Sequence, residues 1–307
     1  MAENFKIGHY TDKETITGCT VIIPPKNNIT SASVRGGAPG TRELALLSPE
    51  KKITGIHALL LTGGSAFGLG AANGLAEILA EQNIGYKTAY GVVPIVPAAV
   101  IFDKNIGDSS AYPTAEDARL AFMQAIEDNM ARGNAGAGTG ATVGKWNGIQ
   151  HAMKGGIGLA RLQEGAVWIE VLTVVNAVGD VLNYNGKILA GARDEAGRFF
   201  GENKTARYRK KPQVGLADNT VLTVLMTNAK INKLQAFQLA EKAHFGIARR
   251  IEPSHTSYDG DTAFVIAHPQ EECDFDLLAG LGVRAVEAGI IDAVKAANTL
   301  AGIKGLA

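Results

Sequence analysis

The sequence predicts a layered α+β sandwich that forms a single domain, and three observations support this fold class and this domain organisation. Strand-like and helix-like segments come in blocks instead of in strict βαβ alternation, which disfavours a doubly wound parallel sheet. The chain shows no internal repeat and no low-complexity linker. Its composition has no break strong enough to mark a domain boundary, so residues 1–307 are expected to form a single domain.

The first hundred residues are expected to supply buried strands and a helix. Residues 18–25 and 55–64 are apolar runs that are typical of buried strands. Apolar residues at helical spacing then predict a helix over residues 65–83.

A second helix is expected over residues 113–133. Thr114 can accept from the backbone at the first turn, and Asp117 stands three residues later, which is the spacing of a capping box. Gly133 is placed to end this helix, because glycine readily takes the left-handed conformation that helix ends favour.

The second half of the chain is expected to add a block of strands and two long helices. Several strand-like runs between residues 148 and 192 indicate an antiparallel meander. The expected elements that follow are a strand, a helix, a strand and an Ala-rich helix, at residues 220–228, 233–249, 262–268 and 275–300.

Composition excludes several classes of function. Lys plus Arg and Asp plus Glu number 30 each, so the net charge is zero and nothing points to nucleic acid or to an anionic membrane. The longest apolar stretch, residues 91–102, is too short for a bilayer and holds two prolines, and the N-terminus is polar from the start. A cytoplasmic protein is expected, or one that is exported by no obvious Sec route. Its cysteines, Cys19 and Cys273, provide no disulfide framework.

Familiar cofactor and nucleophile motifs do not fit. Residues 136–146 resemble a phosphate-binding loop, but Trp146 stands where Ser or Thr is needed. Ser65 lies at a strand-to-helix turn, yet a nucleophile elbow needs glycine where Phe67 stands. The six histidines make no metal-ligand spacing, so neither a metal nor a cofactor is expected.

An N-terminal threonine is the candidate that remains. A predicted strand opens on Thr220, directly after Asp218 and Asn219, which are also ordinary turn residues. If the chain cut itself before Thr220, the new α-amino group, with a pKa of about 7.7–8, would lie within reach of the Thr220 hydroxyl and could act as its base.

Such a nucleophile needs charged partners and a donor for an oxyanion. Asp259 and Asp261 flank a glycine just before a predicted strand, which is equally the pattern of a turn. Asn176 ends an apolar strand, either as a turn residue or as an oxyanion donor. Lys145 follows a glycine-rich run, either at the surface or as a cation held in a cleft.

Long segments resemble the L-aminopeptidase/D-esterase family, which includes β-aminopeptidases and 6-aminohexanoate-oligomer (nylon-oligomer) endohydrolases. The similar segments occur in order from near residue 6 to about residue 300 and are SASVRGGAPGTRE, ALLLTGGSAFGLGAANG, VVPIVPAAVIFD, RGNAGAGTGATVGK and YDGDT. The resemblance implies a four-layer αββα sandwich of the N-terminal-nucleophile-hydrolase type. It also implies self-cleavage between Asn219 and Thr220 into an α chain 1–219 and a β chain 220–307, and a homo-oligomer of such αβ units.

The resemblance also implies roles for the candidate residues. Thr220 would be the nucleophile of self-cleavage and of amide hydrolysis, Asp259 and Asp261 would orient it, and Lys145 and Asn176 would be the charge partner and the oxyanion donor. A threonine with an Asp-Gly-Asp pair resembles the nylon-oligomer hydrolases more than the aminopeptidases, which typically carry a serine nucleophile.

Two substrate-binding positions are expected as well. Phe102 stands where the family often carries a tyrosine whose hydroxyl helps at the site, so this chain departs from the pattern there. Gly138, in the glycine-rich segment 133–140, is expected to bring backbone close to the site, or else to form a structural turn. The expected partner is a small amide or peptide.

Three alternative functions remain open. The basic run of residues 204–211 could be a nucleic-acid site, but it is short and has one aromatic residue, so a solvated loop is expected instead. An acyl transferase of the ornithine-acetyltransferase kind would share the nucleophile and a similar fold. A non-catalytic relative of the fold would lack the self-cleavage.

Overall fold

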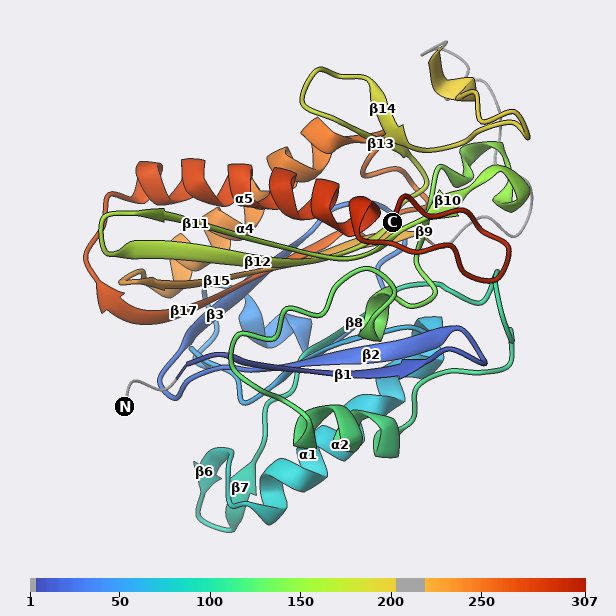
Figure 1. Cartoon of the computed structure of the whole chain (residues 1–307). Coiled ribbons are helices and arrows are strands. Elements are labelled where there is room, and N and C mark those ends of the chain that lie inside the picture. Colours follow the sequence, from blue (N-terminus) through green and yellow to red (C-terminus); the bar gives the residue numbers. More distant parts are fainter. Residues whose placement is uncertain (1–3, 203–218) are drawn as a thin grey trace.

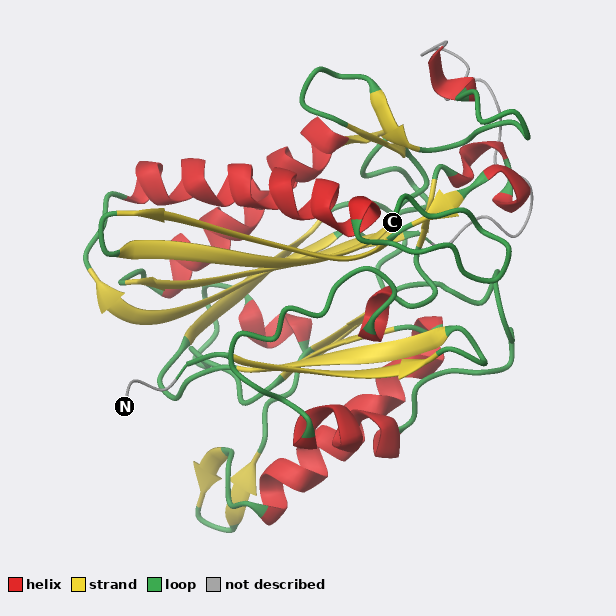
Figure 2. Ribbon diagram, in the orientation of Figure 1, coloured by secondary structure: helices red, strands yellow, loops and turns green. Residues whose placement is uncertain are grey.

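Two β-sheets lie face to face and helices cover their outer faces, as Figures 1 and 2 show. The structure is a computed structural model that describes residues 4–202 and 219–307. Each of the two main sheets has five strands, in the orders β1-β2-β5-β8-β4 and β11-β12-β15-β17-β3. The predicted α+β class and the αββα layering are therefore confirmed.

The first sheet comes from the N-terminal third of the chain. All its neighbouring strands are antiparallel except β5 and β8, which are parallel. Helices α1 (Ala72–Glu81) and α2 (Ala115–Met123) pack on its outer face (Figure 1). Its strands are β1 (Lys6–Asp12), β2 (Thr17–Ile23), β4 (Thr41–Arg42), β5 (Leu59–Thr62) and β8 (Ala98–Val100).

The second sheet is built mainly from the C-terminal half. Strand β15 pairs with β12 antiparallel and with β17 parallel, so it lies in the middle of the sheet. Helices α4 (Lys233–Arg250) and α5 (Phe275–Lys295) cover the outer face. The strands are β3 (Ile29–Val34), β11 (Gly156–Glu164), β12 (Val167–Asn176), β15 (Thr220–Ala229) and β17 (Thr262–Glu271).

The remaining short strands and helices lie outside the two main sheets. The hairpin of β6 (Tyr86–Thr88) and β7 (Gly91–Val93) projects beyond α1 in Figure 1. The remaining short strands are β9 (Thr142–Val143), β10 (Met153–Lys154), β13 (Asp180–Leu182), β14 (Ile188–Ala190) and β16 (Ile251–Glu252). Short 3₁₀ helices are η1 (Leu44–Leu47), η2 (Ser65–Ala71), η3 (Gly136–Gly138), η4 (Lys145–Asn147), η5 (Ile149–His151) and η6 (Phe200–Glu202).

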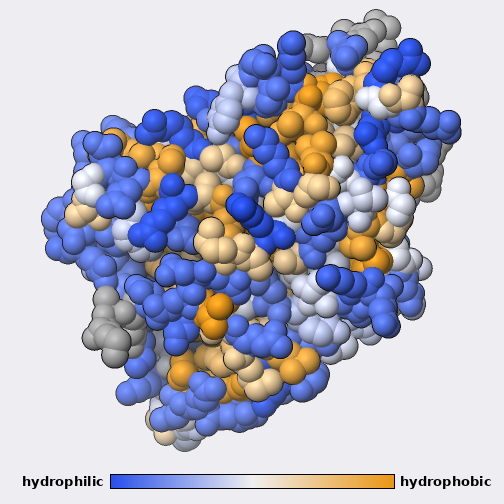
Figure 3. Space-filling model, in the orientation of Figure 1, coloured by the Kyte–Doolittle hydropathy of each residue, from blue (hydrophilic) through white to orange (hydrophobic). Residues whose placement is uncertain are grey.

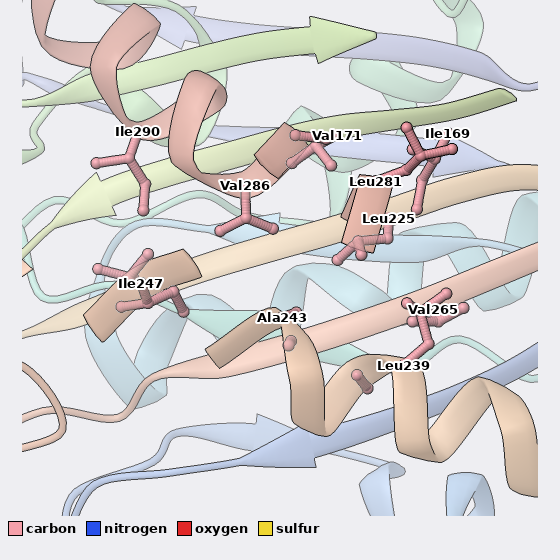
Figure 4. Close-up of a cluster of buried hydrophobic side chains, with 14 of the residues drawn as sticks. Ile169, Val171, Leu225, Leu239, Ala243, Ile247, Val265, Leu281, Val286 and Ile290 are labelled. Carbon is pink, nitrogen blue, oxygen red and sulfur yellow. The ribbon is translucent and has the colours of Figure 1, made fainter. Parts of the chain in front are cut away.

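Three buried hydrophobic clusters fill the three spaces between the four layers. One lies between the two sheets, one between the first sheet and α1 with α2, and one between the second sheet and α4 with α5. Strand β15 contributes side chains to two of these clusters, because successive side chains point to opposite faces of a strand. Leu222 and Val224 belong to the cluster between the sheets, whereas Val221 and Leu225 belong to the cluster on the helix side. Figure 4 shows Leu225 in the latter cluster.

The sequence-based elements are largely confirmed, with one clear error. The Thr114–Asp117 capping box is present, but α2 ends at Met123 and does not continue to Gly133. The chain leaves the helix because Ile126 exchanges backbone hydrogen bonds of 2.9 and 3.1 Å with Ile7 of β1. Gly133, with a φ of 67°, instead pairs with Ile157 at the end of the sheet.

The surface mixes polar and apolar residues. On the face drawn in Figure 3, hydrophobic residues gather in several separate groups among hydrophilic ones. Within residues 4–202 and 219–307, no helix has both the length and the hydropathy that crossing a bilayer requires.

Candidate active site

Thr220 is the first residue of the central strand β15 and is buried, with 4% of its surface exposed. Its hydroxyl donates to the carbonyl oxygen of Asn219 at 2.5 Å. The same carbonyl oxygen accepts the backbone N–H of Gly260 at 2.7 Å. The carbonyl oxygen of the peptide bond that joins Asn219 to Thr220 therefore accepts from both a hydroxyl and a backbone N–H.

The parallel pairing of β15 with β17 brings the aspartate turn to this position. Because Leu222 pairs with Thr262, the residues that precede the two strands lie side by side. Asp261 Oδ1 accepts the backbone N–H of Val221 at 2.7 Å, and Asp259 forms an isolated parallel bridge with Asn219. The predicted Asp259–Asp261 pair thus flanks the start of β15.

Gly260 is held in a space that admits no side chain. A Cβ atom on this residue would lie 2.6 Å from the carbonyl oxygen of Ala38, 2.8 Å from the Cα of Pro39 and 3.0 Å from the hydroxyl of Thr220. Glycine therefore lets the turn approach close enough for its N–H to reach Asn219.

Asn176 lies on the other side of Thr220, as its register partner at the end of β12. Its side-chain Oδ1 accepts from Lys145 Nζ at 2.7 Å and from the backbone N–H of Thr142 at 3.0 Å. Its side-chain Nδ2 donates to the carbonyl oxygen of Phe102 at 2.9 Å, and this bond links the two sheets. Asn176 is therefore fixed in orientation beside the nucleophile candidate.

Lys145 reaches the site because the chain turns sharply before it. Gly144 has a φ of 73°, a left-handed conformation that glycine adopts without strain, and the single turn η4 follows. The Lys145 side chain is 1% exposed, and its ammonium also contacts the Asn176 carbonyl oxygen at 3.2 Å. The structure therefore places Lys145 inside the protein and not at the surface.

Burial moves the ionisation of two of these groups toward neutral pH. Desolvation lowers the pKa of Lys145 to about 7, although the nearby Asp259 acts in the opposite direction. Desolvation, and then repulsion by Asp261, raises the pKa of Asp259 to about 6. Groups that titrate near neutral pH can gain or lose a proton at little cost, which is what general acid–base chemistry requires.

A second buried pair lies behind the glycine-rich segment that carries Lys145. Lys154 Nζ donates to the carbonyl oxygens of Thr139 and Ala141 at 2.8 and 2.6 Å, and burial lowers its pKa to about 7. Asp103 accepts from the Thr17 hydroxyl at 2.7 Å, and burial raises its pKa. Lys154 thereby holds the backbone that positions Lys145.

The two expected substrate-binding residues lie in different places. Phe102 is half-buried, and its carbonyl oxygen contacts Asn176 as described above. Gly138 instead packs against the second sheet, since a Cβ there would lie 2.4 Å from the backbone nitrogen of Ile157. The structure thus gathers Thr220, Asp259, Asp261, Lys145 and Asn176 into one site, with Phe102 at its edge and Gly138 turned toward β11.

Several residues of the site were not expected from the sequence. Gly260 and His255 lie in the same segment as the aspartate pair, and Asp103 follows Phe102 directly, so their nearness in the sequence to expected site residues could have identified them. Lys154 is not next to any expected site residue, so the sequence offered no such indication for it. No cluster of His, Cys, Asp or Glu that suits a metal ion occurs in the part of the chain that the structure describes.

Comparison with known proteins places this chain in a family. The family model described as "Peptidase family S58" matches residues 3–307. An uncharacterized aminopeptidase of Mycobacterium tuberculosis is 38% identical over 280 residues, which cover 85% of this chain and 78% of that protein. A 6-aminohexanoate-oligomer endohydrolase of Kocuria sp. is 31% identical over 294 residues, which cover 92% of this chain and 78% of that protein.

Solved structures agree on the fold. A β-aminopeptidase of Burkholderia sp. superposes with a TM-score of 0.76 at 19% identity and covers 99% of this chain and 89% of its own. The L-aminopeptidase D-Ala-esterase/amidase of Ochrobactrum anthropi, described as a variant of the Ntn-hydrolase fold, has a TM-score of 0.72 at 20% identity, with 96% and 85% covered. This chain is therefore a hydrolase with an Ntn-hydrolase-type sandwich, and it belongs to peptidase family S58.

Proposed function

We propose that this chain is a self-processing amide hydrolase whose nucleophile is Thr220. It cuts itself between Asn219 and Thr220, which yields an α chain 1–219 and a β chain 220–307. The mature enzyme then hydrolyses amide bonds of short peptides or of 6-aminohexanoate oligomers through an acyl-enzyme. The substrate classes come from the relatives, which are named as aminopeptidases and as 6-aminohexanoate-oligomer endohydrolases.

The observation that carries the self-cleavage is the arrangement around the Asn219 carbonyl. The Thr220 hydroxyl lies next to this carbonyl, and the Gly260 N–H already donates to its oxygen at 2.7 Å. In the proposed step, Thr220 Oγ1 attacks the carbonyl carbon while its proton passes to the Thr220 nitrogen, and the C–N bond breaks to leave an ester. Gly260 stabilises the negative charge that develops on the oxygen. Water then hydrolyses the ester, which leaves a carboxylate on Asn219 and a free amine on Thr220.

The same residues serve the second reaction. The freed Thr220 amine takes the proton of its own hydroxyl, which attacks the substrate carbonyl carbon. The amine product leaves with a proton, and water hydrolyses the acyl-enzyme. Asn176 is oriented by Lys145 at 2.7 Å and by Phe102 at 2.9 Å, so its amide is fixed beside the nucleophile and can help to bind the oxyanion.

Denaturing electrophoresis with intact-mass measurement tests the proposal directly. The wild-type protein should give two fragments with the masses of residues 1–219 and 220–307, and Thr220→Ala should give one uncut chain without amidase activity. Thr223→Ala is the matched control, because Thr223 lies on the same strand and its hydroxyl contacts Thr173 instead of the site. A folded wild-type chain that stays uncut would refute the self-cleavage.

A substrate panel then tests the activity. Short L-, D- and β-peptides and 6-aminohexanoate oligomers should release amines with the processed wild type and not with Thr220→Ala. Addition of ornithine distinguishes hydrolysis from acyl transfer, because a transferase would form acyl-ornithine in place of the free acid. Predominant formation of acyl-ornithine would replace the hydrolase proposal.

A further inference from the structure

His255 lies directly behind Asp261, on the side away from β15. Its ring Nδ1 is 2.7 Å from Asp261 Oδ2, and its backbone N–H donates to the same oxygen at 3.2 Å. The other carboxylate oxygen, Oδ1, accepts the N–H of Val221 at 2.7 Å. Asp261 is therefore fixed from both ends, by His255 on one side and by the residue next to Thr220 on the other.

The partners of the His255 ring indicate its charge. Nδ1 faces a carboxylate, and Nε2 faces the carbonyl oxygen of His244 at 3.4 Å. Neither partner has a proton to donate, so a ring that satisfies both contacts carries a proton on each nitrogen and is an imidazolium. Burial is the largest single influence and opposes this charge, but the hydrogen bond to Asp261 and its charge, together with the His244 carbonyl and Asp259, outweigh burial and raise the pKa of His255.

His255 lies between the buried Asp261 and a pocket that is open to solvent. Its side chain is 22% exposed and lines a pocket of about 750 Å³ against α4 and the start of α5. His244 packs edge-on against the ring at 5.0 Å, and burial lowers the pKa of His244 to about 4, so His244 stays neutral. The charged and titratable groups that surround His255 are Asp259, Asp261, His244, Glu241, Lys242, Arg35 and Asp276.

We propose that His255 is a positioning residue, which as an imidazolium holds the Asp261 carboxylate oriented against the start of β15. The inference rests on the proposed function, because its effect reaches the reaction only through Asp261 and Thr220. The imidazolium contributes a hydrogen-bond donor and a charge. Loss of the proton from His255 at high pH removes the charge, and the hydrolysis rate then falls.

Two substitutions separate the donor from the charge. His255 has a φ of 53°, a conformation that asparagine tolerates well, so His255→Asn keeps the backbone and a side-chain donor but loses the charge. His255→Ala loses both. We expect kcat at pH 6.5 to fall about 10-fold in His255→Asn and about 100-fold in His255→Ala, the size of loss that follows misplacement of a catalytic group.

The pH profile distinguishes positioning from a purely structural role. The ratio of wild-type to His255→Asn kcat should decline toward one as pH rises, in a single one-proton step, because both proteins then lack the charge. A ratio that is constant between pH 6 and 9.5 would overturn the proposal, as would wild-type kcat in His255→Ala. His268→Asn makes the same chemical change at the far end of β17 and should leave the profile unchanged.

An NMR measurement tests the pair without any turnover. In the uncut Thr220→Ala protein, ¹⁵N spectra of His255 should show two protonated ring nitrogens at pH 6.5. A neutral ring at that pH would overturn the proposal even if the substituted proteins fail to fold. Retained amidase activity in Thr220→Ala would instead defeat the proposed function, and the NMR result would still stand as a separate test of the His255–Asp261 pair.

Discussion

Substitution of Gly260 by alanine tests whether its N–H assists the self-cleavage. The new methyl group would lie 2.6 Å from the Ala38 carbonyl oxygen, and contacts below 3.0 Å are essentially never found for a Cβ atom. The turn must therefore move by about 0.4 Å or more, the difference between these two distances. Ala38 also donates its N–H to the Asp259 carbonyl oxygen at 3.0 Å, so movement of the turn disturbs this contact as well.

The displacement weakens the contact with the scissile carbonyl. The hydrogen bond from Gly260 to the Asn219 oxygen, now 2.7 Å long, lengthens as the turn moves away. Complete removal of an oxyanion donor costs roughly 10²- to 10³-fold in rate, so a partial loss should slow self-cleavage by about 10- to 100-fold. This corresponds to about 1.4–2.7 kcal/mol in activation free energy.

The assay is a time course of fragment formation on denaturing gels after refolding or cell-free synthesis. Gly280→Ala is the matched control, because a Cβ at this position of α5 meets no atom within 4 Å and alanine favours a helix. Gly280→Ala should therefore mature at the wild-type rate. Maturation of Gly260→Ala at the wild-type rate would refute the role of this N–H.

Three further predictions concern charge, pH and helix capping. Asp261→Asn should slow hydrolysis by about 100-fold or more, because the carboxylate charge is lost. Asp128→Asn is the control, because Asp128 is exposed, and equal hydrolysis rates in the two variants would exclude Asp261 from the mechanism. Burial lowers the pKa of Lys154 in the folded protein. In uncut Thr220→Ala, the unfolded state therefore binds one proton more than the folded state between about pH 7 and 10.5, so the free energy of unfolding rises with pH. Lys154→Met in the Thr220→Ala background should reduce the slope of unfolding free energy against pH by about 1.4 kcal/mol per pH unit. Urea unfolding at pH 8–9.5 measures this slope, and an unchanged slope would contradict the lowered pKa of Lys154. Thr114→Ala should lower stability by about 1 kcal/mol through loss of the α2 cap, whereas Thr88→Ala in the β6–β7 hairpin should cost less.

Local sequence patterns predicted those elements whose stability is decided locally. The capping box of α2 and the apolar periodicity of α4 and α5 depend on residues a few positions apart, and both are present. The end of α2 was misjudged because a tertiary contact decides it. Ile126 leaves the helix to pair with Ile7, which lies more than a hundred residues earlier in the chain.

The same distinction holds for the site. Thr220, the aspartate pair, Asn176 and Lys145 were candidates because each stands at a strand end or after a glycine-rich turn, but each had an equally local explanation. Their convergence follows from the strand order, in which β15 lies between β12 and β17. No local pattern contains that order, because the pairing joins residues that are far apart in the sequence.

Local sequence patterns were therefore sufficient for the class of fold, most of the elements and the residue types of the nucleophile candidate and its charged partners. Three properties depend on packing: the burial of Lys145, which lowers its pKa to about 7, the hydrogen bond from Gly260 to the Asn219 carbonyl, and the contact between His255 and Asp261. These properties depend on burial and on distances of about 3 Å between separate segments. Such distances exist only once the two sheets have packed together.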